Sequence, residues 1–191
     1  MQPERERERE TYEKCFYRRF QRGKKSGEIY GFPMQRGPWC NDRLKMAALD
    51  KVKNIGTGVI QYVGIASDEP ERIARHTKPG ILLPLVELGW DEAYCRKWCV
   101  EKDLLSPIYT TSARGGCWFC HNQGVEQLRL LRKNYPNLWD LLMKWDADSP
   151  VTFHADGRTV QDFEKRFKNE DDGNVPSDRR FRWKMLEKIE S

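Results

Sequence analysis

Residues 59–66 (VIQYVGIA) limit the choice of fold more than any other segment of the chain. The run is almost continuously apolar and rich in β-branched side chains, which is typical of a strand buried on both faces of a parallel sheet. Asp68 and Glu69 follow its end, where open α/β sheets collect their ligands. A second strand is predicted over residues 82–86, and a helix that Asp91 caps over residues 91–102. The alternation predicts an α/β fold with a parallel sheet flanked by helices.

Helical periodicity dominates the remainder of the chain. Tyr12, Cys15, Phe16 and Phe20 recur at helical spacing and predict a helix that ends near Gly23, with Cys15 in the core. Further helices are predicted over residues 43–53, 125–133, 137–147, 160–168 and 179–189. Residues 1–10 alternate Glu and Arg and are expected to form a charged tail. The part that follows the sheet should therefore be mainly helical.

The composition indicates a folded cytoplasmic protein. With 191 residues, 38% of them hydrophobic and 12% aromatic, the chain can bury the core of one main domain. The longest apolar run, residues 81–86, is far shorter than the ~20 residues of a membrane-spanning helix. The alternating Glu and Arg at the start are unlike a secretory signal. In a cytoplasmic setting the six cysteines are expected to be reduced, metal-bound or reactive rather than paired in disulfides.

The net charge of +5 is compatible with an anionic partner such as a nucleotide. Binding of single-stranded nucleic acid through the basic residues 14–25 is disfavoured, because the aromatic side chains there follow the pattern of a helical core.

The segment Cys117-Trp118-Phe119-Cys120 carries two thiols on one tight turn. Thiolates at this spacing bind zinc or iron, perform redox chemistry, or are simply structural, and a single pair does not choose between these roles. A metal needs further ligands, and Cys40 is the best third. The fourth would be Cys99, His121 or a non-protein ligand. Cys95 and Cys99 share a helix face with aromatic neighbours, so a core position suits them better.

Several blocks of the chain, taken in order, resemble the phosphoadenosine phosphosulfate reductase family, especially its phage and bacterial members. The blocks are Gly31–Pro33, Trp39–Cys40, Arg43–Lys45, Tyr62–Ile65, Asp68–Arg72, Ser106–Tyr109 and Arg114–Cys120. The resemblance implies a Rossmann-like sheet of the adenine-nucleotide α-hydrolase kind. It covers residues 11–150 as the C-terminal part of such a domain, with residues 151–191 as a helical extension.

The chain departs from the family pattern in three places. The Ser-Gly-Gly-x-Asp-Ser loop that holds phosphate or sulfate is absent, and by position it would precede Met1. We therefore expect a truncated product, half of a split protein, or a member that has lost nucleotide chemistry. Trp39 replaces the first of two adjacent cysteines that four-iron reductases carry, which leaves a three-cysteine site with one open iron. The last cysteine is Cys120, so the cysteine-bearing C-terminal tail of the reductases is missing.

The cations next to matched blocks are assigned to an anionic ligand, because guanidinium groups suit phosphate and sulfate oxygens. These are Arg43, Lys45, Arg72 and Arg114. Ordinary surface charge is the alternative for each of them. Asp68 and Glu69 would bind a ribose or a metal, or cap the following helix through Arg72. No residue is assigned a catalytic role.

Two functions follow as hypotheses. The first is sulfonucleotide reduction or sulfur transfer on an adenine nucleotide, with an iron–sulfur cluster or zinc at Cys40, Cys117 and Cys120 and a partner protein that supplies the missing loop. The second is a non-catalytic, metal-stabilised module of phage origin that binds nucleotide or protein.

Overall fold

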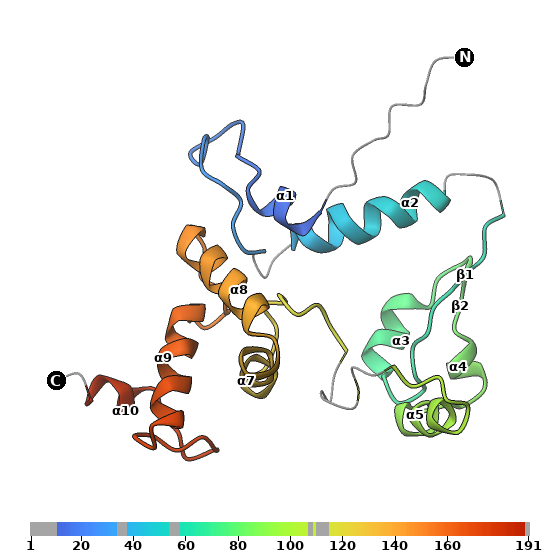
Figure 1. Ribbon diagram of the computed structural model, residues 1–191. Coiled ribbons are helices and arrows are strands. Elements are labelled where there is room, and N and C mark those ends of the chain that lie inside the picture. Colours follow the sequence, from blue (N-terminus) through green and yellow to red (C-terminus); the bar gives the residue numbers. More distant parts are fainter. Residues whose placement is uncertain (1–10, 34–37, 54–57, 107–108, 110–114, 190–191) are drawn as a thin grey trace. The chain divides into compact units, whose positions relative to one another are not determined.

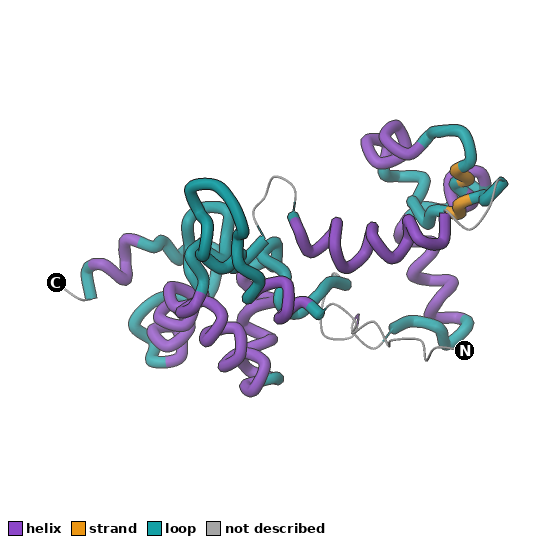
Figure 2. Tube along the Cα trace, turned by 90° about the horizontal axis from the view of Figure 1, so that it is seen from above, coloured by secondary structure: helices purple, strands orange, loops and turns teal. Residues whose placement is uncertain are grey.

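The computed structural model describes residues 11–33, 38–53, 58–106, 109 and 115–189. The predicted charged tail, residues 1–10, lies outside this part. The chain divides into two compact units, which we call unit 1 (Met1–Ala47 with Gly116–Ser191) and unit 2 (Ala48–Gly115). Helices and loops make up almost all of the described chain, and the strands are short (Figure 2). The fold is thus mixed α/β and dominated by helices.

Unit 1 is helical. It begins with α1 (Tyr12–Phe16) and then a loop closed by an antiparallel bridge between Arg19 and Ile29. A π-helical segment, η1 (Asn41–Met46), runs directly into α2 (Ala47–Lys53), which continues into unit 2. The second half of unit 1 holds α7 (Val125–Asn134), α8 (Pro136–Asp148), α9 (Val160–Asp171) and α10 (Lys184–Glu187).

The core of unit 1 lies where α7, α8 and α9 pack against one another (Figure 1). Trp139, Leu142 and Trp145 recur at helical spacing on α8 and are all buried, as the sequence predicts. Phe16 of α1 stacks on Trp145 with ring centroids 5.7 Å apart. Phe153 belongs to the same cluster. Residues before position 47 and after position 150 therefore share one core with α7 and α8.

Ion pairs join α7 to α9 beside this core. Arg129 donates two hydrogen bonds to Glu170 Oε2, at 3.1 Å from Nε and 2.8 Å from Nη2. Arg166 Nε donates to the other oxygen of Glu170 at 2.7 Å. One turn along α7, Arg132 pairs with Glu164 at 2.8 Å. Charged side chains inside the bundle are thus matched by opposite charges.

Unit 2 contains the sheet. Strand β1 (Gln61–Tyr62) leads through α3 (Pro70–His76) to β2 (Ile81–Leu82), and α4 (Pro84–Glu87) and α5 (Glu92–Glu101) follow. The strands pair in parallel, with Gln61 opposite Ile81. Helix α5 begins as predicted, because the Asp91 side chain accepts a hydrogen bond from Tyr94 N at 2.6 Å.

Four predicted elements are wrong in extent. The helix expected over residues 179–189 is limited to α10 (Lys184–Glu187). The strand expected over residues 59–66 is two residues long, and Tyr62 is 68% exposed instead of buried. Residues 84–86 are helical rather than extended, because Pro84 takes the first helical position, where its missing N–H is not needed. Helix α1 ends at Phe16 instead of near Gly23, because Phe20 and Tyr30 form backbone hydrogen bonds within the bridged loop.

Candidate functional site

The turn that carries Cys117 and Cys120 is fixed by hydrogen bonds to its own backbone. Cys120 N donates to Cys117 O at 3.0 Å. The side chain of Gln123 donates from Nε2 to the carbonyl oxygens of Cys117, at 2.8 Å, and of Trp118, at 2.9 Å. These hydrogen bonds fix the backbone conformation of the turn that carries both thiols. Cys117 is exposed and Cys120 is half-buried.

Cys40 directly precedes η1 and is partly buried. Burial raises the pKa of its thiol, and hydrogen bonds from backbone N–H groups, chiefly that of Asn41, partly offset the increase. Charges at Cys120 and Cys117 raise the same pKa further. Thiols from two distant parts of the chain are therefore close enough for their charges to interact.

The same three thiols also influence Tyr12 of α1 electrostatically. The pKa of its hydroxyl is raised, first by burial and then by charges at Cys40, Cys120 and Cys117. All three thiols thus lie near enough to this buried hydroxyl of unit 1 to influence it electrostatically. Among the described residues, however, no group of three His, Cys, Asp or Glu side chains has the arrangement needed to hold a metal ion. The thiols are near one another without converging on a single point.

Aromatic rings pack around Tyr12. The Tyr12 ring lies 4.0 Å from that of Phe119, 5.0 Å from that of Trp39 and 5.2 Å from that of Trp145, measured between centroids. Trp118 stacks on Trp145 at 5.4 Å. Cys40 packs against the same core, whereas Cys117 is exposed to water.

The two candidates for a fourth ligand lie in different units. His121 is buried at 6% exposure in the cysteine turn of unit 1, and burial, with a further contribution from His154, lowers its pKa. A neutral imidazole is the form that binds metals. Cys99 lies on α5 of unit 2, where Cys95 interacts with it electrostatically. The choice of His121 or Cys99 as the fourth ligand therefore stays a prediction.

The predicted anion-binding residues are also divided. Arg43 and Lys45 lie on η1 of unit 1, and Arg43 Nη2 donates to the hydroxyl of Tyr30 at 3.2 Å. Lys45 is exposed. Arg72 lies on α3 of unit 2 and forms an ion pair with Glu69. Arg114 is outside the described residues.

The carboxylates after β1 bind neighbouring groups. Asp68 Oδ1 accepts a hydrogen bond from Glu92 N at 3.2 Å, at the start of α5. Glu69 accepts from Ala66 N at 3.2 Å, and its hydrogen bond with Arg72 lowers its pKa. Glu69 pairs with Arg72, as one of the predicted alternatives has it, but its side chain does not cap α3.

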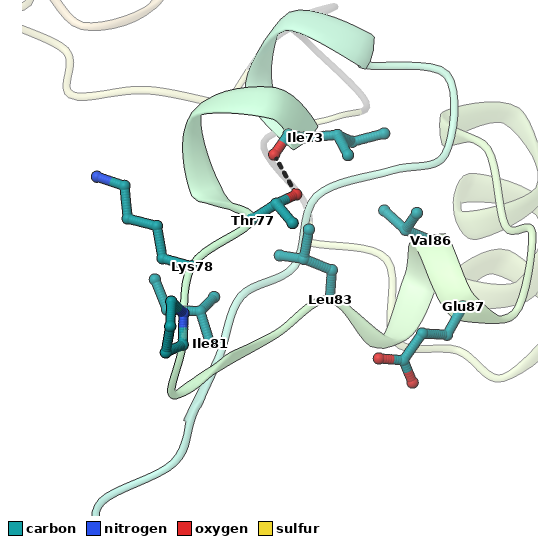
Figure 3. A pocket seen from close by; sticks show the side chains of 8 residues that line it. Ile73, Thr77, Lys78, Ile81, Leu83, Val86 and Glu87 are labelled. Carbon is teal, nitrogen blue, oxygen red and sulfur yellow. Dashed lines mark hydrogen bonds between the residues drawn. The ribbon is translucent and has the colours of Figure 1, made fainter.

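One concave site was missed by sequence reasoning. It is a pocket of about 410 Å³ in unit 2, between α3, β2 and α4. Figure 3 shows Leu83 between Lys78 and Glu87, with the Thr77 hydroxyl bonded to Ile73 O at 2.8 Å. Its lining side chains are Ile73, Thr77, Lys78, Pro79, Ile81, Leu83, Val86 and Glu87. No predicted site residue lines it, and nothing in the sequence pattern singles out its mostly apolar side chains.

Comparison with known proteins finds one informative similarity. The chain is 31% identical over 115 residues to the "Uncharacterized nin region protein ORF290" of Escherichia phage lambda. The alignment covers 57% of this chain and 37% of that protein, so the chain spans little more than a third of the length of this relative. No family model and no solved structure matches the chain. Within the described residues, no helix is long and apolar enough to cross a membrane.

Proposed function

We propose that this chain is a phage-encoded cytoplasmic protein of the phosphoadenosine phosphosulfate reductase kind, acting in sulfur transfer or sulfonucleotide reduction. We further propose that Cys40, Cys117 and Cys120 hold its metal centre. The observation that carries the proposal is that Cys40 and the turn of Cys117 and Cys120, from distant segments, pack on one core: the Tyr12 ring lies 5.0 Å from that of Trp39 and 4.0 Å from that of Phe119. The phage origin is supported by the similarity to the lambda protein.

The chemistry of the site suits a soft metal. Thiolates favour zinc and iron–sulfur clusters over hard cations. Cys40 has backbone N–H groups to stabilise its thiolate, and Gln123 holds the turn of the other two. Because the three thiols do not converge on one point, the cysteine turn would have to move toward Cys40 before the site could bind a metal. Cys117 is exposed, which leaves that side of the site open for such a movement.

In this proposal the chain's own residues perform distinct tasks. The three cysteines would bind the centre, and the aromatic rings around Tyr12 form the packed core beside it. An iron–sulfur centre held by three cysteines supplies an open position for a sulfur atom. Arg43, on the same π-helical segment that starts at Cys40, would bind the anionic part of a substrate.

The nucleotide part of the proposal rests on unit 2. Its two parallel strands have Asp68 and Glu69 just beyond the end of β1, the edge where Rossmann-like sheets bind ligands. A partner polypeptide would supply further strands and the phosphate-binding loop. Apolar side chains exposed around this small sheet, such as Val59, Ile60 and Tyr62, support the presence of a partner.

Metal analysis together with an absorption spectrum of anaerobically purified protein tests the centre. We expect a stoichiometric metal centre that Cys117→Ser abolishes. Cys95→Ser is the matched control, because Cys95 is a half-buried thiol on α5 of unit 2. If both variants retain the metal of the wild-type protein, or if the wild-type protein binds none, the proposal is wrong.

A second candidate function is favoured by the apolar surface of unit 2. Besides the three residues named above, Leu82, Leu88 and Val100 are exposed there. A module that binds another protein without catalysis would need such a surface. It would carry zinc or no metal, and adenine nucleotides would leave its melting temperature unchanged. Under the first proposal, nucleotide binding raises the melting temperature, and Arg72→Ala, a change beside the sheet of unit 2, weakens that effect. Lys24→Ala, a change at an exposed loop residue, leaves it intact.

A further inference from the structure

The loop over residues 17–30, which we call the basic ribbon, has two antiparallel limbs. Tyr30 N donates to Arg18 O at 2.8 Å, and Phe20 N donates to Glu28 O at 2.9 Å. The ribbon projects from α1 on the side away from α9 and α10 (Figure 1). The residues of its turn are all exposed. The basic ribbon is thus a narrow projection whose turn faces solvent.

The aromatic side chains of the basic ribbon do not lie where the sequence predicts. The predicted helix ends near Gly23 and places Phe20 in a core, and that pattern is the reason against nucleic-acid binding at this segment. Helix α1 ends at Phe16, however, and the Phe20 ring stacks on that of Tyr30 with centroids 4.5 Å apart. Neither of these two rings belongs to the hydrophobic core that the described residues form. The reason against nucleic-acid binding therefore no longer applies.

Positive charge is concentrated on the basic ribbon. Its five basic residues and one acidic residue give it a net charge of +4, and the whole chain has a net charge of +5. Three of these cations, Arg22, Lys24 and Lys25, lie in the exposed turn. None of the three forms an ion pair within the part of the chain that the structure describes. Like charges so close together repel one another, and a bound polyanion would remove that repulsion.

Side-chain contacts hold the basic ribbon in place at its base. Tyr17 Oη donates to Asp148 at the end of α8, at 2.6 Å. On the other limb, the Tyr30 hydroxyl accepts from Arg43 of η1, whose guanidinium lies 5.4 Å from the centre of the Tyr30 ring. The turn is therefore carried by a segment that is already ordered, which lowers the entropic cost of binding a partner.

We propose that the basic ribbon binds double-stranded DNA, with its turn in the major groove and its cations on the phosphates. The major groove of B-DNA admits a two-stranded ribbon, whereas that of an RNA duplex is too narrow. A lipid surface fits less well, because residues 21–26 of the turn include no apolar side chain to insert. A protein partner is disfavoured by the two lysines, since lysine is depleted at protein interfaces. This binding site goes beyond the proposed function, because neither the cysteines nor unit 2 takes part in it.

Binding of the full chain to duplex DNA tests the proposal. The probe is a fluorescently labelled duplex of about 20 base pairs, and anisotropy gives the binding constant between about 50 mM and 200 mM salt. Contacts from three turn cations predict a slope of about −2.7 when its logarithm is plotted against that of the salt concentration. The combined variant Arg22→Gln, Lys24→Gln and Lys25→Gln should bind at least about a hundredfold more weakly at about 50 mM salt, with a slope near zero.

The matched control removes the same charge from helices of unit 1 outside the basic ribbon. It combines Lys133→Gln on α7, Lys168→Gln on α9 and Lys184→Gln on α10, all at exposed positions. Its binding should be no more than about threefold weaker, because salt screens exposed charges that lie farther than about 10 Å from the contact. Both combined variants should keep the melting temperature of the wild-type protein, since all six side chains are exposed.

Four results would overturn the proposal. The first is that the wild-type protein does not bind the duplex, and the second is that the ribbon variant and the control variant lose equal affinity, as a diffuse effect of charge predicts. The third is tighter binding to a single strand of the same length, which contradicts insertion into a groove. The fourth is binding to phosphatidylglycerol vesicles as tight as to the duplex at equal phosphate concentration, which would identify a lipid surface as the partner.

Discussion

Two carboxylates bind the same guanidinium group in unit 1 and differ strongly in burial. Arg129 pairs with Glu126, which is 69% exposed, and with Glu170, which is 4% exposed. Glu170 also accepts the hydrogen bond of Arg166, whose side chain is 8% exposed. Truncating each carboxylate to alanine therefore tests how much burial changes the contribution of an ion pair.

The expected magnitudes follow from that difference. Removing one partner of a buried pair leaves an uncompensated charge and costs about 3–5 kcal/mol, whereas an exposed pair contributes about 0.2–1 kcal/mol. Glu170→Ala strands Arg166, whose guanidinium also stacks 3.7 Å from the Phe181 ring centroid. We expect Glu170→Ala to lower the free energy of unfolding by about 3–5 kcal/mol, and Glu126→Ala by less than about 1 kcal/mol.

Urea unfolding followed by far-UV circular dichroism measures both values, because α7 and α9 contribute to the helical signal. Equal slopes of free energy against urea would show that the same surface is exposed in each variant. If the two substitutions differ by less than about 1 kcal/mol, the assumption that burial determines the strength of these pairs is refuted.

Two further predictions concern unit 1. Gly31 has a φ of +66°, and a Cβ there would lie 2.5 Å from Ser149 Oγ. Gly31→Ala should therefore lower the free energy of unfolding by about 2–3 kcal/mol in the same assay. Gly23 is also at positive φ but faces open space, so Gly23→Ala should have a smaller effect. Burial alone would raise the pKa of Glu164, but hydrogen bonds from Arg132 and Trp139 outweigh it and the pKa is lowered. This stabilisation is complete above the ordinary glutamate pKa and is lost as the pH falls through the lowered value, so Glu164→Gln should flatten the acid part of a stability profile measured between about pH 6 and pH 3. An unchanged profile would contradict the role of Glu164.

The long helices of unit 1 were predictable because their apolar residues recur at helical spacing. Trp139, Leu142 and Trp145 on α8 show the pattern clearly, and all three are buried. The Asp91 cap of α5 was predictable for a similar reason, since the preference of aspartate for this position is local. The strands were predicted less well, because an apolar run does not reveal whether other strands and helices cover it. Val59, Ile60 and Tyr62 have strand-like sequence and yet are exposed.

The candidate site, too, combines features that the sequence predicted with features that it did not. The sequence indicated which side chains could bind a soft metal, because thiol chemistry and the spacing of Cys117 and Cys120 are local properties. It did not reveal that the Tyr12 hydroxyl and the Trp145 indole N–H are buried without a hydrogen-bond partner among the described residues. It also assigned Arg43 and Arg72 to one anionic ligand; the two residues belong to different units, and the assignment stays a prediction.

By itself, the sequence determined the chemical character of the residues and the local structure of the long helices, because both depend on neighbours a few positions away. Tertiary structure decided which groups share a water-poor environment. The Tyr12 ring meets side chains from both ends of the chain, and only that packing sets the burial and electrostatic environment of the three thiols. Burial and electrostatic coupling depend on distance in space, which residue spacing does not encode.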